Sequence, residues 1–204
     1  MVNKELQLLV ATKNNEKVAE LKNLLSNFPV RLRSLREFVD AGDVKETGEN
    51  FKENAALKAQ GYALHTGLWS LADDSGLEVE ALRGAPGIFS ARYGGKSATD
   101  QVKIKKLLRE LNKKQNDERF ARFVCAMAIS DEKGEIKFVA EGICNGRISL
   151  EPRGNNGFGY DPIFIPAGFN ETFGELSSEI KQQISHRAQA SKKIIQYLRD
   201  FYAL

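Results

Sequence analysis

Histidine and cysteine are scarce in this 204-residue sequence, which contains only two of each. Two histidines exclude a metal site built mainly from imidazole ligands. Cys125 and Cys144 both lie in apolar, strand-like segments, so we expect buried thiols and neither a disulfide framework nor a cysteine metal site. This cysteine usage is typical of a reducing compartment and gives a cytoplasmic location as the expectation.

Long apolar runs and a strong excess of one charge are also missing. No segment approaches the roughly 18 apolar residues of a membrane-spanning helix, and residues 1–5 lead into a short apolar run that lacks the longer core of a signal peptide. The 30 basic and 27 acidic residues are scattered, so we expect neither a membrane nor a nucleic acid as a partner. The densest basic run, residues 103–114, falls on a predicted amphipathic helix, where a solvated outer face is the simpler interpretation.

Apolar periodicity alternates between strand-like and helix-like segments. Residues 6–11 form an apolar run that predicts a buried strand, and the helical spacing of Val18, Leu21 and Leu25 predicts a helix after it. The nearly apolar stretch 120–129 predicts a central strand, followed by a hairpin turn at 130–134 and by strands over 135–140 and 143–150. The pattern favours an α/β fold with a mixed sheet.

A polar loop, Thr12 to Lys17, joins the first predicted strand to the first predicted helix. Backbone N–H groups at such a helix start bind anions, and either Asn14 or Asn15 can cap it. Lys13 and Lys17 are mildly disfavoured at the positive end of a helix, and a bound anion would remove that conflict. A plain strand–helix connection with exposed lysines is the alternative.

Two adjacent carboxylates, Asp73 and Asp74, follow an apolar strand-like run and precede a Ser-Gly turn. We expect the strand to end there and to present both acids at the edge of a sheet. Adjacent carboxylates repel each other unless they share a cation, and oxygen ligands suit Mg²⁺ together with phosphate. An ordinary solvated turn is the alternative interpretation.

Other polar residues are weaker site candidates. Glu46 precedes a predicted helix that ends at Gly67, and helix capping explains it simply. Asn54 and Lys58 share a face of that helix with aromatic residues, so they reach solvent or point into a site. His186 and Arg187 lie off the apolar stripe of the last helix, which is usually a surface feature.

A glycine-rich loop at residues 152–162 contains Phe158 and Tyr160. Its glycines allow a ligand to approach the backbone closely, and its aromatic rings can stack on a nucleobase. Packing of these rings on the core is the alternative.

Taken together, these signals describe a site for phosphate, metal and base. The sequence resembles the inosine/xanthosine triphosphate pyrophosphatase (Ham1-like) family from residue 8 to about residue 195. Six motifs carry the resemblance and appear in the expected order: Thr12-x-Asn14-x-x-Lys17; Glu46-Thr47-Gly48 with Asn54-Ala55 and Lys58; Ala72-Asp73-Asp74-Ser75-Gly76-Leu77; Ser90-Ala91-Arg92-Tyr93; Gly157-Phe158-Gly159-Tyr160-Asp161-Pro162; and Ser185-His186-Arg187.

The resemblance implies a single domain over residues 1–204, two-lobed, with a long mixed central sheet flanked by helices and an active site in the cleft between the lobes. It also implies a homodimer. The implied activity is Mg²⁺-dependent hydrolysis of purine nucleoside triphosphates with a non-standard base (ITP, dITP and XTP) to the monophosphate and pyrophosphate, which removes them from the nucleotide pool.

Residue roles follow from the same resemblance. Asp74 would be the general base, and Ser75 would touch the substrate. The metal ligands would be Glu46, Asp73 and Asp74. The phosphates would meet Thr12, Lys13, Asn14, Asn15, Glu16, Lys17 and Lys58. The base and sugar pocket would comprise Phe158, Gly159, Tyr160, Asp161, Lys181, His186 and Arg187. The sequence by itself does not distinguish Asp73 from Asp74.

Hydrogen bonding supplies a basis for the implied base preference. Hypoxanthine and xanthine carry a 6-keto acceptor where adenine carries an amino donor. Donors from Arg187 or from backbone N–H groups would therefore favour the keto bases. Two alternatives stay open: a Maf-like pyrophosphatase acting on pyrimidine or modified nucleotides, and a non-catalytic nucleotide-binding regulatory module.

Overall fold

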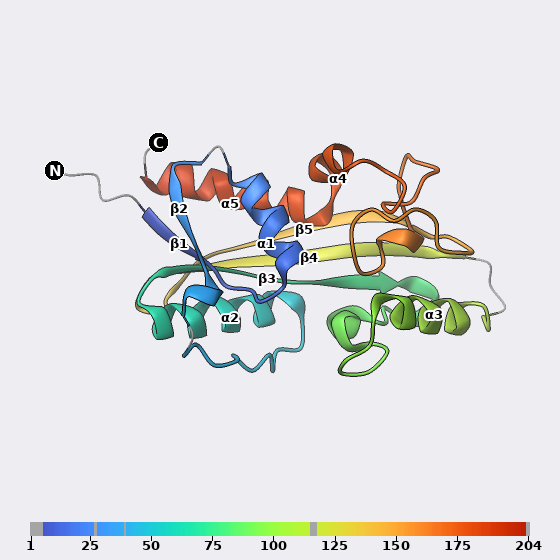
Figure 1. The fold of residues 1–204 in the computed structure, drawn as a ribbon, viewed down its shortest axis with the longest axis horizontal. Helices are drawn as coiled ribbons and strands as arrows, with labels where there is room; N and C mark the ends of the chain where they lie inside the picture. Colours follow the sequence, from blue (N-terminus) through green and yellow to red (C-terminus); the bar gives the residue numbers. More distant parts are fainter. Residues whose placement is uncertain (1–5, 27, 39, 115–117, 203–204) are drawn as a thin grey trace. The chain divides into compact units, whose positions relative to one another are not determined.

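A computed structural model describes residues 6–26, 28–38, 40–114 and 118–202 (Figure 1). Residues 1–5, on which the expectation about a signal peptide depended, lie outside these ranges. The chain forms two compact units. Unit 1 contains Met1–Asp74, Cys125–Gly142 and Arg187–Leu204, and unit 2 contains Ser75–Val124 and Ile143–His186. No helix within the described ranges has the length and apolar character needed to cross a membrane.

A six-stranded sheet is the central element. Its strand order is β2 (Val30–Ser34), β1 (Leu6–Val10), β3 (Trp69–Val79), β4 (Phe120–Ser130), β5 (Ile136–Ile148) and β6 (Phe164–Pro166). Strand β1 pairs in parallel with both β2 and β3, whereas β5 and β6 are antiparallel. The prediction of an α/β fold with a mixed sheet is therefore confirmed. Strands β3, β4 and β5 each contribute residues to both units.

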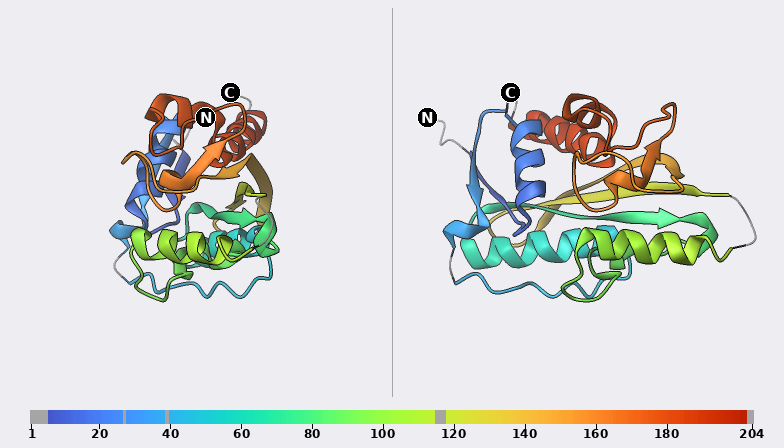
Figure 2. Two further views of the ribbon diagram at one scale, coloured as in Figure 1. Left: turned by 90° about the vertical axis from the view of Figure 1, so that its right-hand side faces the viewer. Right: turned by 45° about the vertical axis from the view of Figure 1, so that its right-hand side comes forward.

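Helices cover both faces of the sheet in unit 1. The helices are α1 (Asn15–Leu24), α2 (Phe51–Thr66) and α5 (His186–Tyr202), and a short 3₁₀ turn, η1 (Leu35–Glu37), follows β2. Helices α1 and α5 lie on one face and α2 lies on the other in every view (Figures 1 and 2). The core beneath α1 and α5 joins Leu21 and Ile194 to Val10 and Leu71 of the sheet.

The ends of α2 follow the local sequence signals. The Asn50 side chain caps the helix by accepting the backbone N–H of Glu53, which satisfies one of the free N–H groups at the helix start. Gly67 ends the helix with φ of +66°, a conformation that glycine adopts without strain. The predicted stop at Gly67 is confirmed.

Unit 2 is built from short helical segments around an aromatic core. Its helices are α3 (Asp100–Leu111) and α4 (Ser178–Ile184), with 3₁₀ segments η2 (Glu80–Leu82), η3 (Gly87–Arg92) and η4 (Asp161–Ile163). Phe123 packs against Phe164 and Phe173, with ring centroids 4.5 and 6.3 Å away. Leu77 and Leu107 belong to the same core.

Two predicted strand boundaries are wrong. Strand β3 does not end at the acidic pair but continues through Ser75 and Gly76 to Val79. It lies between β1 and β4 and is largely buried, so sheet pairing and burial outweigh the local turn preference of Ser-Gly. For the same reason β5 is one strand where two were expected. Cys125 and Cys144 are buried free thiols, as predicted.

Candidate active site

The two adjacent aspartates point to opposite faces of β3, because successive side chains alternate along a strand. Asp73 faces α1 and α5, where its Oδ2 lies 2.9 Å from Lys17 Nζ and 3.2 Å from Arg187 Nη2. Asp74 faces α2, where its Oδ1 lies 3.2 Å from Lys58 Nζ. Figure 2 shows these helices on the two sides of the sheet. Each carboxylate of the pair thus has a lysine ammonium of its own within 4 Å.

The Asp73 side is a buried charge network. Asp73 and Arg187 are each only 2% exposed. Arg187 also forms an ion pair with Glu20 of α1. Burial by itself would raise the pKa of Asp73, but the charges of Lys17 and Arg187 hold that pKa well below its usual range. Asp73 is therefore a fixed negative charge at any moderate pH.

The Asp74 side has the opposite electrostatic character. Burial, together with the nearby Glu46 charge, raises the pKa of Asp74 above its ordinary value, although Lys58 and Lys17 act against this shift. Asp74 Oδ2 is buried and accepts no hydrogen bond within the described ranges. A carboxylate with a raised pKa and an open oxygen is suited to accept a proton.

Glu46 joins the Asp74 side through Lys58, whose Nζ lies 3.3 Å from Glu46 Oε2. Burial lowers the pKa of Lys58, but the surrounding carboxylates outweigh burial and raise it overall. The segment that carries Glu46 is fixed because Asn54 accepts the Gly48 N–H at 2.8 Å. Helix capping does not explain Glu46, since Asn50 caps α2.

The structure does not bring the three predicted metal ligands together. In the part of the chain that it describes, no group of three or more His, Cys, Asp and Glu side chains is placed to hold a metal ion. Glu46 and Asp74 lie around the same lysine, whereas Asp73 lies on the other face of β3. Two carboxylates with an open oxygen still fit Mg²⁺, which typically takes one or two carboxylates plus phosphate oxygens.

The loop from Thr12 to Lys17 forms the start of α1 as predicted. Asn14 is the cap and accepts the Lys17 N–H at 3.0 Å. Thr12 Oγ1 accepts the Asn14 N–H at 3.2 Å. This first turn directs Lys17 inward to Asp73, while backbone N–H groups at the helix start provide a surface for an anion.

Other predicted phosphate residues of this loop point outward. Lys13 is exposed and forms a surface ion pair with Asp43 at 2.6 Å. The Asn15 side chain accepts a hydrogen bond from Arg36 at 2.5 Å. Glu16 is exposed in the first turn of α1. These three residues have surface partners or are exposed to solvent, whereas Lys17 contacts the buried Asp73.

A buried carboxylate, Asp161, contacts the aromatic loop of unit 2 at two points. Asp161 Oδ2 accepts the Phe158 N–H at 2.8 Å and Lys181 Nζ at 2.7 Å. The Lys181 ammonium also lies 4.9 Å from the centre of the Phe158 ring. Gly157 has φ of +73°, and a Cβ there would lie 2.0 Å from Asp161 Oδ2. The loop is therefore fixed before any ligand binds, and it requires glycine at position 157.

Five of the seven predicted base-pocket residues are buried: Tyr160, Asp161, Lys181, His186 and Arg187. Tyr160 is 4% exposed, and its hydroxyl donates to the Ser90 carbonyl at 3.0 Å. The His186 ring stacks on Phe123 with centroids 4.7 Å apart. Arg187 is enclosed in unit 1. The interpretation of His186 and Arg187 as surface features is wrong, because both side chains are buried at the start of α5. Ser75, by contrast, is half-buried on β3.

Comparison with known proteins places this geometry in a family. A model described as the Ham1 family matches residues 8–197. The chain belongs to the Ham1 family. It is 44% identical over 197 residues to the dITP/XTP pyrophosphatase of Rhodopirellula baltica, covering 97% of this chain and 95% of that one. It is 46% identical over 188 residues to the dITP/XTP pyrophosphatase of Bacillus licheniformis, covering 92% and 95%.

The fold comparison agrees. A solved Ham1 protein from Coxiella burnetii has a TM-score of 0.89 and 41% sequence identity, covering 96% of this chain and 99% of that chain. The family that the six motifs indicated is thus confirmed, and so is its fold class.

Sequence reasoning missed two residues of this Ham1 chain that contact predicted site residues. Glu20 pairs with Arg187, which lies 167 positions later in the chain. Asp100 accepts the Gly159 N–H at 2.7 Å and so fixes the aromatic loop. Each had an adequate local explanation: Glu20 lies one turn from Lys17 on α1, and Asp100 lies at the positive end of α3. No local signal would have identified either residue.

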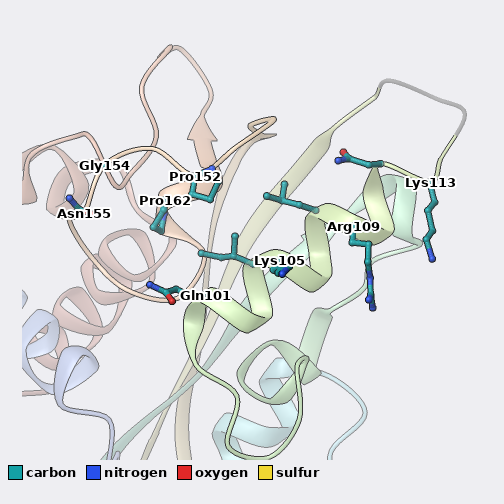
Figure 3. Close-up of a pocket in the computed structure, with 11 residues that line it drawn as sticks. Gln101, Lys105, Arg109, Lys113, Pro152, Gly154, Asn155 and Pro162 are labelled. Carbon is teal, nitrogen blue, oxygen red and sulfur yellow. The ribbon is translucent and has the colours of Figure 1, made fainter.

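A groove lies elsewhere in unit 2 of this Ham1 chain, between α3 and the loop at residues 152–162 (Figure 3). It has a volume of about 670 Å³, with Ile104 and Leu108 among its apolar walls and Lys105, Arg109 and Lys113 along the helix. None of the predicted site residues lines it. The basic run that was predicted to be a solvated helix face therefore forms one wall of a groove.

Proposed function

We propose that this protein hydrolyses ITP, dITP and XTP to the corresponding monophosphate and pyrophosphate, and that it acts in the cytoplasm on the nucleotide pool. Support comes from the relatives named dITP/XTP pyrophosphatase. The observation that carries the proposal is the environment of Asp74: a buried carboxylate with a raised pKa and an open oxygen, placed beside Lys58. A carboxylate in this environment is suited to accept a proton.

Triphosphate binding is assigned to the two inward lysines and to the start of α1. An ammonium has three N–H donors, so Lys17 and Lys58 can each keep a carboxylate and still bind phosphate oxygens. Backbone N–H groups from Thr12 to Lys17 would add neutral donors at a helix N-terminus. Lys13, Asn15 and Glu16 would contribute from the rim of this loop.

Glu46 and Asp74 would hold Mg²⁺ together with phosphate oxygens. When bound, the ion would neutralise phosphate charge and lower the pKa of attacking water. Asp74 would take the proton of the attacking water. The water oxygen then bonds to the α-phosphorus, and the bond from that phosphorus to the bridging oxygen breaks, so that pyrophosphate leaves. Lys17 and Lys58 would stabilise the charge that develops on the phosphate oxygens.

Base binding is assigned to the loop that Asp161 fixes. Phe158 would stack on the purine, with Gly159, Tyr160, Asp161 and Lys181 around the base and sugar and Ser75 touching the substrate. Donors from Arg187 or from backbone N–H groups would favour a 6-keto base over the 6-amino group of adenine. His186 and Arg187 are buried in other contacts, so their proposed contacts require side-chain movement when the substrate binds.

We further propose that residues 1–204 act as one domain and that the protein is a homodimer. Light scattering during gel filtration measures the second statement directly. A monomer at micromolar concentration would contradict it without affecting the proposed chemistry.

A substrate panel tests the activity. Pyrophosphate release is measured from ITP, dITP, XTP, GTP, ATP and dTTP, with and without Mg²⁺. We expect Mg²⁺-dependent release from the first three at a kcat/KM far above that for ATP. Equal efficiency on ATP and ITP would overturn the base preference, preference for dTTP would indicate a pyrimidine enzyme, and nucleotide binding without turnover would indicate a binding module.

A further inference from the structure

We infer that Asp73 is a positioning residue for the triphosphate and not a metal ligand: it fixes the Lys17 ammonium at the start of α1. This inference rests on the proposed function, because it gives Lys17 the phosphates as its target.

Strand geometry separates Asp73 from the metal. Adjacent residues of a strand point to opposite faces, and Asp74 is the one that faces α2 with Glu46 and Lys58. Asp73 faces α1 and α5 instead. A single ion held by Glu46 and Asp74 therefore has no need of the Asp73 carboxylate.

One oxygen of Asp73 joins three elements of unit 1. Its Oδ2 accepts both the Lys17 ammonium from α1 and the Arg187 guanidinium from α5. Arg187 has a second carboxylate in Glu20. Across the described residues, Asp73 is the only carboxylate within 4 Å of Lys17 Nζ. Loss of the Asp73 charge would therefore release Lys17 more than Arg187.

The first turn of α1 directs Lys17 inward, and the contact with Asp73 fixes its ammonium there. Its neighbours Lys13 and Asn15 have surface partners instead. A flexible lysine loses rotamer freedom when it is fixed, and fixing it in the free protein spares that cost when the triphosphate binds. Asp73 thus raises affinity for the phosphates without touching them.

The inference is tested by measuring, in the same variants, how the hydrolysis rate depends on the Mg²⁺ concentration and on the ITP concentration. For Asp73→Asn we expect the KM for ITP to rise about tenfold or more, as for the loss of a charge-assisted hydrogen bond. The Mg²⁺ concentration at half-maximal rate should change less than about twofold, whereas Glu46→Gln should raise it about tenfold or more, in the range seen when a metal site is perturbed. An equal rise in the Mg²⁺ requirement for Asp73→Asn and Glu46→Gln would overturn the inference.

A double-mutant cycle tests whether Asp73 acts through Lys17. Lys17→Met should raise the KM by itself, and adding Asp73→Asn should then raise it less than about twofold further. Fully additive effects would overturn the proposed route. Asp131→Asn is the matched control, because Asp131 is a buried carboxylate of unit 1 that holds the β4–β5 turn through the Lys133 and Glu135 N–H groups. It should lower the Tm and leave the KM unchanged.

Two further measurements keep the inference testable if Asp73→Asn does not fold or if the proposed function is wrong. If Asp73→Asn does not fold, Asp73→Glu keeps the charge but displaces it by one methylene, and the same split between KM and Mg²⁺ dependence is expected. If the wild type does not hydrolyse ITP, the proposed function fails, and metal-free binding of tripolyphosphate still tests Asp73. Equal affinity of wild type and Asp73→Asn for tripolyphosphate would overturn the inference in that case.

Discussion

In each unit, one oxygen of a buried aspartate contacts a segment that carries proposed site residues. In unit 1, Asp73 Oδ2 receives two cationic side chains, Lys17 and Arg187. In unit 2, Asp161 Oδ2 receives one cation, Lys181, and the backbone N–H of Phe158. The two carboxylates have the same burial and the same number of donors in these contacts, but their donors differ in kind.

That difference determines what each carboxylate can hold in place. Side chains from α1 and α5 meet at Asp73, so this contact orders charges that come from distant parts of the sequence. The Phe158 N–H lies three residues from Asp161, so that contact orders a loop conformation. We therefore expect substrate binding to be sensitive to changes of charge at Asp73 in unit 1. In unit 2 we expect it to be sensitive to changes of backbone geometry near Asp161.

The largest effect is expected from a variant that removes the proposed proton acceptor but leaves the contacts of Asp73 and Asp161 intact. Asp74→Asn eliminates the proposed proton acceptor, so kcat for ITP should fall by about 10² to 10⁴. Nucleotide binding should remain, because Lys17 and the aromatic loop are untouched. Single-turnover rates with a parallel binding titration measure the two effects, and unchanged kcat would refute the assignment of Asp74.

Gly157→Ala should break the unit 2 contact alone. A Cβ at this position would lie 2.0 Å from Asp161 Oδ2 at φ of +73°, so the loop must move. We expect the KM for ITP to rise by about tenfold, a typical cost of mispositioning a binding group. Inhibition by tripolyphosphate should not change.

Gly168→Ala is the matched control for that change. Gly168 also has a positive φ, +86°, but nothing lies within 4 Å of a Cβ there. Backbone strain alone should lower the Tm and leave the KM unaltered. A similar KM increase in both variants would show that strain, and not the Asp161 contact, is responsible.

The dependence of stability on pH sharpens the contrast between Asp73 and Asp74. The cations around Asp73 depress its folded-state pKa, so its contribution to stability is present above the unfolded value of about 4 and is lost as pH falls below it. The Tm difference between wild type and Asp73→Asn should therefore shrink as pH falls from 6 toward 3. A difference that stays constant over this range would contradict the buried ion pair.

The contribution of Asp74 to stability should depend on pH in the opposite direction to that of Asp73. Burial raises its folded pKa, so its ionised form costs stability at neutral pH and that cost disappears as pH falls. Asp74→Asn should be at least as stable as the wild type at pH 7.

The smallest expected effect is on the outer side of the phosphate loop. Asp43→Asn removes the exposed partner of Lys13, and exposed ion pairs contribute little because water screens them. Tm and KM should both be unchanged within error. A clear KM increase would mean that Lys13, and not only the inward Lys17, is held ready for the phosphates.

Sequence periodicity predicted the α/β class. Local signals predicted the helix stop at Gly67 and an asparagine cap for α1, left open between Asn14 and Asn15, because each depends on residues within a few positions. Motif order identified the family. The unbroken course of β3 could not be predicted, since neighbouring strands outweigh the local preference of Ser75 and Gly76. The separation of Asp73 from Asp74 was hidden for the same reason: a strand directs them to opposite faces and a turn does not.

Because β3 is continuous, the protein is expected to tolerate few insertions or deletions within this strand. Inserting or deleting one residue between the β1 pairing region at Trp69–Leu71 and Asp73 would turn every later side chain to the other face. The proposed proton acceptor would then point at α1, and its neighbour would point at Lys58. Length variants of this segment are expected to be absent from active homologues.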